Sequence, residues 1–181
     1  PPTITCPADE PFECIGDIPA MPLTYADFIA AGGSASDNCG LDETTFTASE
    51  SDNGNNCPRI ITRTFEIADS CGNVSQCQQV ITVDDTTPPT ITCPADENYE
   101  CIGDIPALPA TYADFIAAGG SASDNCGLDE TTFTASETDN GANCPRIITR
   151  TFEIADSCGN IISCQQMITV DDITPPTINC P

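Results

Sequence analysis

Cysteine is the residue type in this chain most able to form covalent bonds, and thirteen cysteines occur among 181 residues. Twelve of them form two series of six, with each member recurring 87 positions later. The chain has no histidine and no CxxC spacing, which disfavours zinc sites and thioredoxin-like redox motifs. An even number of cysteines at fixed spacing predicts three structural disulfides per series, formed in an oxidising compartment.

Six cysteines allow fifteen connectivities, and two of the possible schemes differ in which cysteine is left over. The local scheme, which we predict, pairs Cys6–Cys14, Cys39–Cys57 and Cys71–Cys77, then Cys93–Cys101, Cys126–Cys144 and Cys158–Cys164. It leaves Cys180, a copy of Cys6 and Cys93, unpaired in this chain. The alternative scheme joins successive repeats through Cys77–Cys93 and Cys164–Cys180 and leaves Cys6 unpaired.

Carboxylates are the second group of side chains that could carry out chemistry. The chain has 28 acids against four arginines, for a formal net charge of −24. So acidic a surface disfavours nucleic acid and anionic membranes as partners. Paired acids could in principle serve a glycosidase, but among so many carboxylates a suitable pair arises by chance. Without histidine, GxSxG, HExxH or a phosphate-binding glycine loop, the sequence predicts a protein that is not an enzyme.

The cysteine spacing is part of a whole-sequence repeat. Residues 88–174 repeat residues 1–87 with eleven substitutions. Residues 175–181 begin a third copy, so the chain reads as a window from a longer array. A unit of this length buries a thin core, which agrees with a need for disulfides. No apolar run is long enough to span a membrane.

Each copy is rich in short strand signals. Strands are expected at Thr3–Cys6, Pro11–Ile15 and Thr44–Ala48, and as a hairpin of Arg59–Ile67 with Val74–Val83. A short helix is expected within Thr24–Gly33, capped by Thr24, with Tyr25, Phe28 and Ile29 on one face as a lid on the core. The segments 34–40 and 49–56 are expected to be loops. Arg59 and Arg63 share one strand face and are expected to pair with carboxylates.

This pattern predicts an all-β fold with one short helix per repeat, arranged as tandem immunoglobulin-like β-sandwich domains stapled by disulfides. The two prolines in the linker 84–90 predict a semi-rigid connection. Loops at the N-terminal end of one sandwich would face the end of the preceding domain. Oxygen ligands gathered there would suit calcium, and the candidates are Asp84, Asp85, Asp124, Asn125 and Asp156.

Four phrases occur in order in each copy, and in the first copy they are SDNCG, ITRTFEIADSCGN, CQQVITVDD and DDTTPPTITCP. With these phrases the chain resembles the hyalin repeat and related hyalin-like, cysteine-containing repeats found in tandem in very large bacterial surface proteins. The resemblance implies an immunoglobulin-like fold used as an extracellular stalk or adhesion module, without catalysis. The insert Ile18–Gly33 is a departure from the shortest hyalin repeats.

The function expected is therefore a structural repeat of an extracellular bacterial surface fibre or adhesin stalk, with other copies of itself as partners. The alternatives are an adhesive module that binds glycans or another cell surface, through residues 18–33 or 49–56, and an accessory domain of a secreted hydrolase. Candidate glycosylation sites are Asn73, in an Asn-Val-Ser sequon that the second copy lacks, and the junction threonines Thr86, Thr87 and Thr174.

Overall fold

The computed structural model describes residues 1–180, and these form two compact units, the first from Pro1 to Thr86 and the second beginning at Thr87. The division falls one residue before the boundary of the sequence repeat. The elements of the first unit are β1 (Thr3–Thr5), β2 (Glu10–Phe12), η1 (Ile15–Asp17), α1 (Tyr25–Ala30), β3 (Ser34–Ser36), β4 (Leu41–Asp52), β5 (Arg59–Asp69) and β6 (Val74–Val83). Those of the second unit are β7 (Thr90–Thr92), β8 (Glu97–Tyr99), η2 (Ile102–Asp104), α2 (Tyr112–Ala117), β9 (Ser121–Ser123), β10 (Leu128–Asp139), β11 (Arg146–Asp156) and β12 (Ile161–Val170).

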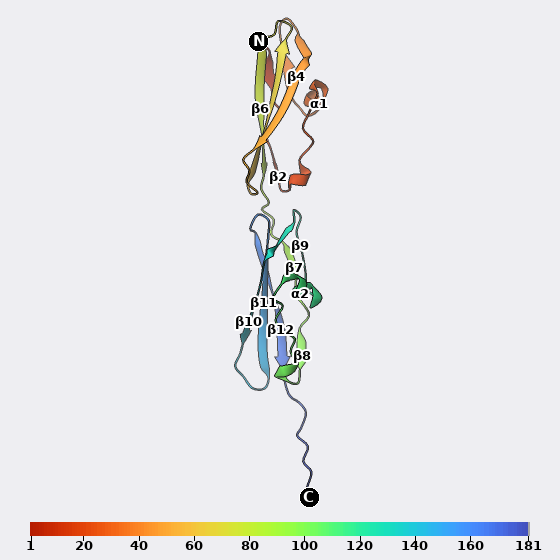
Figure 1. The fold of residues 1–181 in the computed structure, drawn as a ribbon, viewed down its shortest axis with the longest axis vertical. Helices are drawn as coiled ribbons and strands as arrows, with labels where there is room; N and C mark the ends of the chain where they lie inside the picture. The colour runs from red at the N-terminus through yellow and green to blue at the C-terminus, as the bar shows by residue number, and fades with distance from the viewer. Residues whose placement is uncertain (181) are drawn as a thin grey trace. The chain divides into compact units, whose positions relative to one another are not determined.

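Each unit contains a four-stranded sheet and a two-stranded sheet. In the first unit the larger sheet has the order β2-β6-β5-β4, with β2 parallel to β6 and the other pairs antiparallel. The smaller sheet pairs β1 with β3. The second unit repeats this topology with β8-β12-β11-β10 and β7-β9. Figure 1 shows the long strands of each unit running alongside one another, with the short helix to one side. The predicted all-β, disulfide-stapled fold is confirmed.

A phenylalanine cluster joins the two sheets and the helix of the first unit. Phe28 from α1 packs with Phe46 from β4 and with Phe65 and Ile67 from β5. The small sheet contributes Ile4 and Ala35 to the same cluster, so burial of these side chains is what holds the sheets face to face. The second unit has the equivalent cluster around Phe115, Phe133, Phe152 and Ile154.

Strand β5 shows the alternation that the sequence predicts. Ile61, Arg63, Phe65 and Ile67 on one face are buried, and the residues between them are half-buried. Its hairpin with β6 pairs Arg59 with Val83 and continues without a break to Ala68 and Val74. An unbroken register fixes which side chains face the core.

Three local expectations are corrected. Residues 34–36 form β3 and not a loop, because their backbone pairs with β1. Residues 49–52 extend β4, because they pair with β5 as far as Asp52 and Ile61. Ile29 was expected on the buried face of the helix but is 44% exposed, whereas Phe28 is fully buried. Phe28 is the buried residue of the six-residue helix, and Tyr25 packs half-buried against the same cluster.

The helix boundaries follow the predicted signals. The side chain of Thr24 accepts a hydrogen bond from the backbone N–H of Asp27, which caps the first turn. The chain leaves the helix through Gly32, whose φ of +95° suits glycine, and then Gly33. Gly33 has a different reason: a Cβ there would lie 2.4 Å from the Phe28 ring. Glycine lets the backbone close over the buried ring.

Replacement of Gly33 by alanine is expected to destabilise the first unit by about 1 to 3 kcal/mol, because the added methyl group overpacks a fully buried ring. Urea denaturation of the chain, followed by tyrosine fluorescence, would measure the loss. Gly16→Ala is the matched control, since a Cβ at Gly16 meets no atom within 4 Å. Equal stability of the two variants would contradict this role of Gly33.

Candidate functional site

The disulfides connect segments that are far apart in sequence. Cys6 is bonded to Cys77, and in the second unit Cys93 is bonded to Cys164, each with a sequence separation of 71. Cys6 directly follows β1 and Cys77 lies in β6. Both cysteines pack against the phenylalanine cluster of the first unit. The bridge thus ties the first strand of the unit to its last strand.

The predicted local pairing is wrong. The Cys6–Cys77 and Cys93–Cys164 bonds exclude Cys6–Cys14, Cys71–Cys77, Cys93–Cys101 and Cys158–Cys164, and also the alternative bridges Cys77–Cys93 and Cys164–Cys180. Cys39–Cys57 and Cys126–Cys144 are excluded because Cys39 and Cys144 are free. The physical reason is the packing of β1 near β6, which brings distant cysteines together across the core. Proximity in sequence does not report such a contact.

Four more cysteines, Cys14, Cys57, Cys126 and Cys158, are also disulfide-bonded. The remaining ones are free and exposed: Cys39, Cys71, Cys101, Cys144 and Cys180. Bridges in both units indicate an oxidising environment of the extracellular type. None of the helices in residues 1–180 has the length and hydropathy of a membrane span.

A buried arginine fastens the insert to the large sheet. Arg63 on β5 is only 5% exposed. Its Nε donates to Oε2 of Glu50 at 2.9 Å, and its Nη2 donates to the carbonyl oxygen of Pro19 at 2.7 Å. In the second unit Arg150 makes the same contacts with Glu137 and Pro106. The expected pairing of these arginines with carboxylates is confirmed.

Arg59 also pairs with a carboxylate, that of Asp52, but at the exposed end of the hairpin. A hydrogen bond from the backbone of Gly54 and one from Arg59 hold the pKa of Asp52 below its ordinary value. Arg146 and Asp139 repeat this pair. The two arginines of each strand therefore have different roles: one is a buried clamp and the other a surface ion pair.

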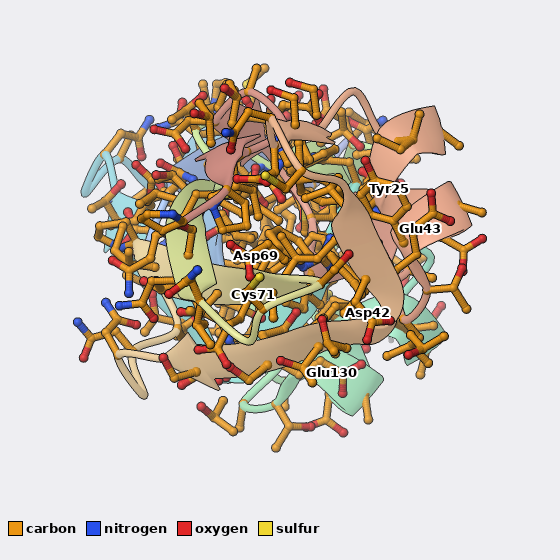
Figure 2. The ribbon with its side chains drawn as sticks, turned by 90° about the horizontal axis from the view of Figure 1, so that it is seen from above. Tyr25, Asp42, Glu43, Asp69, Cys71 and Glu130 are labelled. Atoms are coloured by element: carbon orange, nitrogen blue, oxygen red, sulfur yellow. A yellow bond between two sulfur atoms is a disulfide. The ribbon has the colours of Figure 1, made fainter. Side chains whose placement is uncertain are left out.

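The carboxylate of Asp69 organises the loop between β5 and β6. Its Oδ1 accepts from the backbone N–H groups of Cys71 and Asn73, and its Oδ2 accepts from the Asn73 side chain. Figure 2 shows Asp69 and Cys71 close together at this end of the unit. The hydrogen bonds from the side chain and backbone of Asn73 hold the pKa of Asp69 below its ordinary value.

Asp156 organises the equivalent loop of the second unit through Cys158 and Asn160. Burial raises the pKa of Asp156, but hydrogen bonds from the side chain and backbone of Asn160 outweigh it, so that the pKa lies below its ordinary value. A carboxyl with a depressed folded pKa stabilises the fold above its unfolded pKa, about 3.9 for Asp. The stabilisation is lost as the pH falls through the folded pKa.

The double variant Asp69→Asn/Asp156→Asn is therefore expected to be less stable than the unaltered chain at pH 7 and to lose less stability between pH 5 and pH 2. Urea denaturation at a series of pH values would measure both effects. The control is Asp17→Asn/Asp104→Asn, which removes the same charge from exposed positions. If the double variant and the unaltered chain lost stability equally as the pH falls, Asp69 and Asp156 would not be the carboxylates that stabilise the fold.

The predicted calcium ligands lie on both units. Asp84 and the buried Asp85 belong to the first unit, and Asp124, Asn125 and Asp156 belong to the second. Oδ1 of Asp124 accepts from the backbone N–H groups of Cys126 and Gly127. Both oxygens of Asp156 accept hydrogen bonds within its own loop. Calcium binding by these five residues stays a prediction.

The predicted glycosylation sites also make hydrogen bonds. The Asn73 side-chain nitrogen donates to Asp69 at 2.7 Å. The hydroxyl of Thr86 donates to the Glu13 carboxylate, and that of Thr174 donates to Glu100. A sugar on either threonine would replace the donated proton and break that contact. Glycosylation at Asn73, Thr86, Thr87 and Thr174 stays a prediction.

A small pocket lies where the insert meets the large sheet of the first unit. Its volume is about 240 Å³, and its lining comes from β2, the insert, β5 and β6: Glu10, Pro19, Ala20, Pro22, Ala31, Arg63, Gln79 and Ile81. Two of the polar lining groups are already engaged, since Gln79 donates to the carbonyl oxygen of Ala8 and Arg63 binds Glu50 and Pro19. Arg63 and Gln79 in the pocket wall therefore stabilise the fold through contacts within the unit.

The chain matches no model of a known protein family, and no curated protein matches it. The resemblance to the hyalin repeat accordingly stays a prediction from the sequence phrases.

Proposed function

We propose that the chain is a non-catalytic structural segment of an extracellular fibre or adhesin stalk on a bacterial cell surface. In this proposal hyalin-like repeats follow one another as stiff, disulfide-bonded beads, and like copies associate into filaments. The observation that carries the proposal is that both units repeat the same supporting contacts. The arginine clamp, the aspartate loop and the bridge between the first and last strands each occur twice.

The pattern of substitution supports the same proposal. None of the eleven residues of the first unit that differ in the second is buried. Most exposed residues are nevertheless identical, including the helix YADFIA and the strand LDETTFTASE. A contact made by the surface of one unit is then available to the next, which is the condition for a heterologous interface to propagate along a filament.

Glycan binding by the insert is the competing proposal. A second pocket there, of about 350 Å³, is lined by Ala20, Met21, Pro22, Leu23, Asp27 and Ala31. This lining contains no aromatic side chain to stack on a sugar ring, and Leu23 is replaced by Ala110 in the second unit. The insert therefore offers less support for a repeated sugar site than for a structural role.

Electron microscopy of native surface material, labelled with antibodies raised against this chain, would test the proposal. The expected result is labelled filaments with an axial spacing of one or two repeats. Antibody preabsorbed with the purified chain is the control. Labelled, isolated, flexible strings without an axial period would contradict the filament, and binding of the purified chain to a glycan array would favour the competing proposal.

A further inference from the structure

The two units carry complementary sets of disulfides. In the first unit Cys14 and Cys57 are bonded while Cys39 and Cys71 are free. In the second unit the reverse holds: the equivalents of Cys39 and Cys71 are bonded, and the equivalents of Cys14 and Cys57 are free. The two units are nearly identical in sequence, so each one shows which bridge the other can form.

The backbone around Cys39 and Cys71 shares one backbone hydrogen bond with its bonded counterpart in the second unit. The N–H of Ser70 donates to the carbonyl oxygen of Gly40 at 3.2 Å, and the equivalent bond from Ser157 to Gly127 measures 3.3 Å. Ser70 and Gly40 are the sequence neighbours of Cys71 and Cys39, and Ser157 and Gly127 are those of Cys158 and Cys126. This contact assigns Cys126 and Cys158 to each other, and it is present for Cys39 and Cys71 as well.

The aspartates that hold these cysteines are also the same. Oδ1 of Asp37 accepts from the N–H of Cys39, and Oδ1 of Asp69 accepts from the N–H of Cys71, both at 2.8 Å. In the second unit Asp124 and Asp156 bind Cys126 and Cys158 at the same distance. The Ser–Gly hydrogen bond and the two aspartate contacts that surround the bonded pair are therefore also present around the free pair.

The other pair lies at the opposite end of β5. Phe12 pairs with Val83 in parallel register, and Val83 pairs with Arg59 in antiparallel register. Cys14 follows Phe12 by two residues and Cys57 precedes Arg59 by two, so both extend beyond the same end of the sheet. The second unit repeats this register with Tyr99, Val170 and Arg146. Cys101 and Cys144 therefore occupy the positions of the bonded Cys14 and Cys57.

We infer that each unit carries three disulfides, so that Cys39–Cys71 and Cys101–Cys144 form in addition to the bridges already present, with Cys14–Cys57 and Cys126–Cys158 as their counterparts. The oxidant is a disulfide, either a small molecule or an oxidoreductase. A cysteine thiolate attacks one of its sulfurs to give a mixed disulfide, and the second cysteine thiolate then displaces the remaining thiol. Two thiols lose two protons and two electrons, and the oxidant's disulfide is reduced to two thiols. All four cysteines are exposed and accessible to such a reagent.

The proposal gives each unit one bridge at either end of its central strand β5 or β11 and one between its first and last strands. Only Cys180, among residues 1–180, is then left without a partner. Cys57 and Cys71 each lie two residues beyond an end of β5, so a covalent bridge lies close to both ends of this strand.

Thiol labelling of the whole chain tests the inference. The chain is refolded with oxidised and reduced glutathione, denatured without reductant, alkylated, and mapped by mass spectrometry of peptides. The expected result is one alkylated residue, Cys180, together with the linked peptides Cys39–Cys71 and Cys101–Cys144. Alkylation of all five cysteines that are free in the structure, or linkage of these four in other combinations, would overturn it.

Two variants sharpen the measurement. In a Cys180→Ser background no residue should be labelled. Adding Cys39→Ser should then expose Cys71 alone, and adding Cys101→Ser should expose Cys144 alone. Unchanged labelling after either second substitution would overturn the pairing. These results do not depend on whether the chain forms a fibre. The disulfide pairing and the proposed fibre function can therefore be disproved independently.

Discussion

Replacement of both Cys6 and Cys77 by alanine is expected to remove about 4 kcal/mol of unfolding free energy from the first unit. The bridge spans a sequence separation of 71, and the restriction that a cross-link imposes on the unfolded chain grows with the length of the loop. The whole net stability of a small domain is about 5 to 15 kcal/mol. The first unit should therefore melt about 15 to 30 °C below its normal temperature, as measured by scanning calorimetry of the whole chain.

The second unit provides an internal reference in this experiment, because it keeps the Cys93–Cys164 bridge. The calorimetric trace should separate into an early transition for the altered unit and a late one for the intact unit. Cys180→Ala is the matched control, since Cys180 is exposed and carries no bridge. A single transition at the normal temperature would contradict the expected weight of the disulfide.

Much of the fold could be predicted because its information is local. The alternation of apolar residues along residues 59–67 placed β5, and the Thr24 cap with the following glycines placed α1. Strand β3 could not be predicted in this way, because Ser34–Ser36 has no strand signal of its own and depends on pairing with β1. The same holds for the end of β4, where polar residues are strand only through β5.

The disulfide pairing could not be predicted because it depends on packing between distant segments. Six cysteines allow many connectivities, and the shortest loops are not the ones that a sandwich brings together. A bridge between the first and last strands closes each unit on itself and requires no neighbouring unit, as the predicted local scheme also would.

The largest effect of a single substitution outside the cysteines is expected for Arg63→Met. Methionine keeps most of the side-chain volume but leaves the Glu50 carboxylate and the Pro19 carbonyl without their donor. A hydrogen bond to a charged group contributes about 1.5 to 3 kcal/mol, and the Glu50 side chain is still 40% exposed, so we expect a loss of about 2 to 3 kcal/mol. Urea denaturation would measure it.

The segment that opens first in Arg63→Met shows whether Arg63 fastens the insert or stabilises the whole unit. Because Arg63 holds the insert at Pro19, the segment 18–33 should open before the sheet unfolds and become the first site of protease cleavage. Arg59→Met is the matched control on the same strand. Its ion pair with Asp52 has side chains 36% and 31% exposed, and such a pair contributes at most about 1 kcal/mol. Early cleavage of the insert in both variants, or in neither, would show that Arg63 does not fasten it. The sequence places these two arginines four residues apart on one strand face. Arg63 differs from Arg59 because the insert covers it and accepts its hydrogen bond through Pro19.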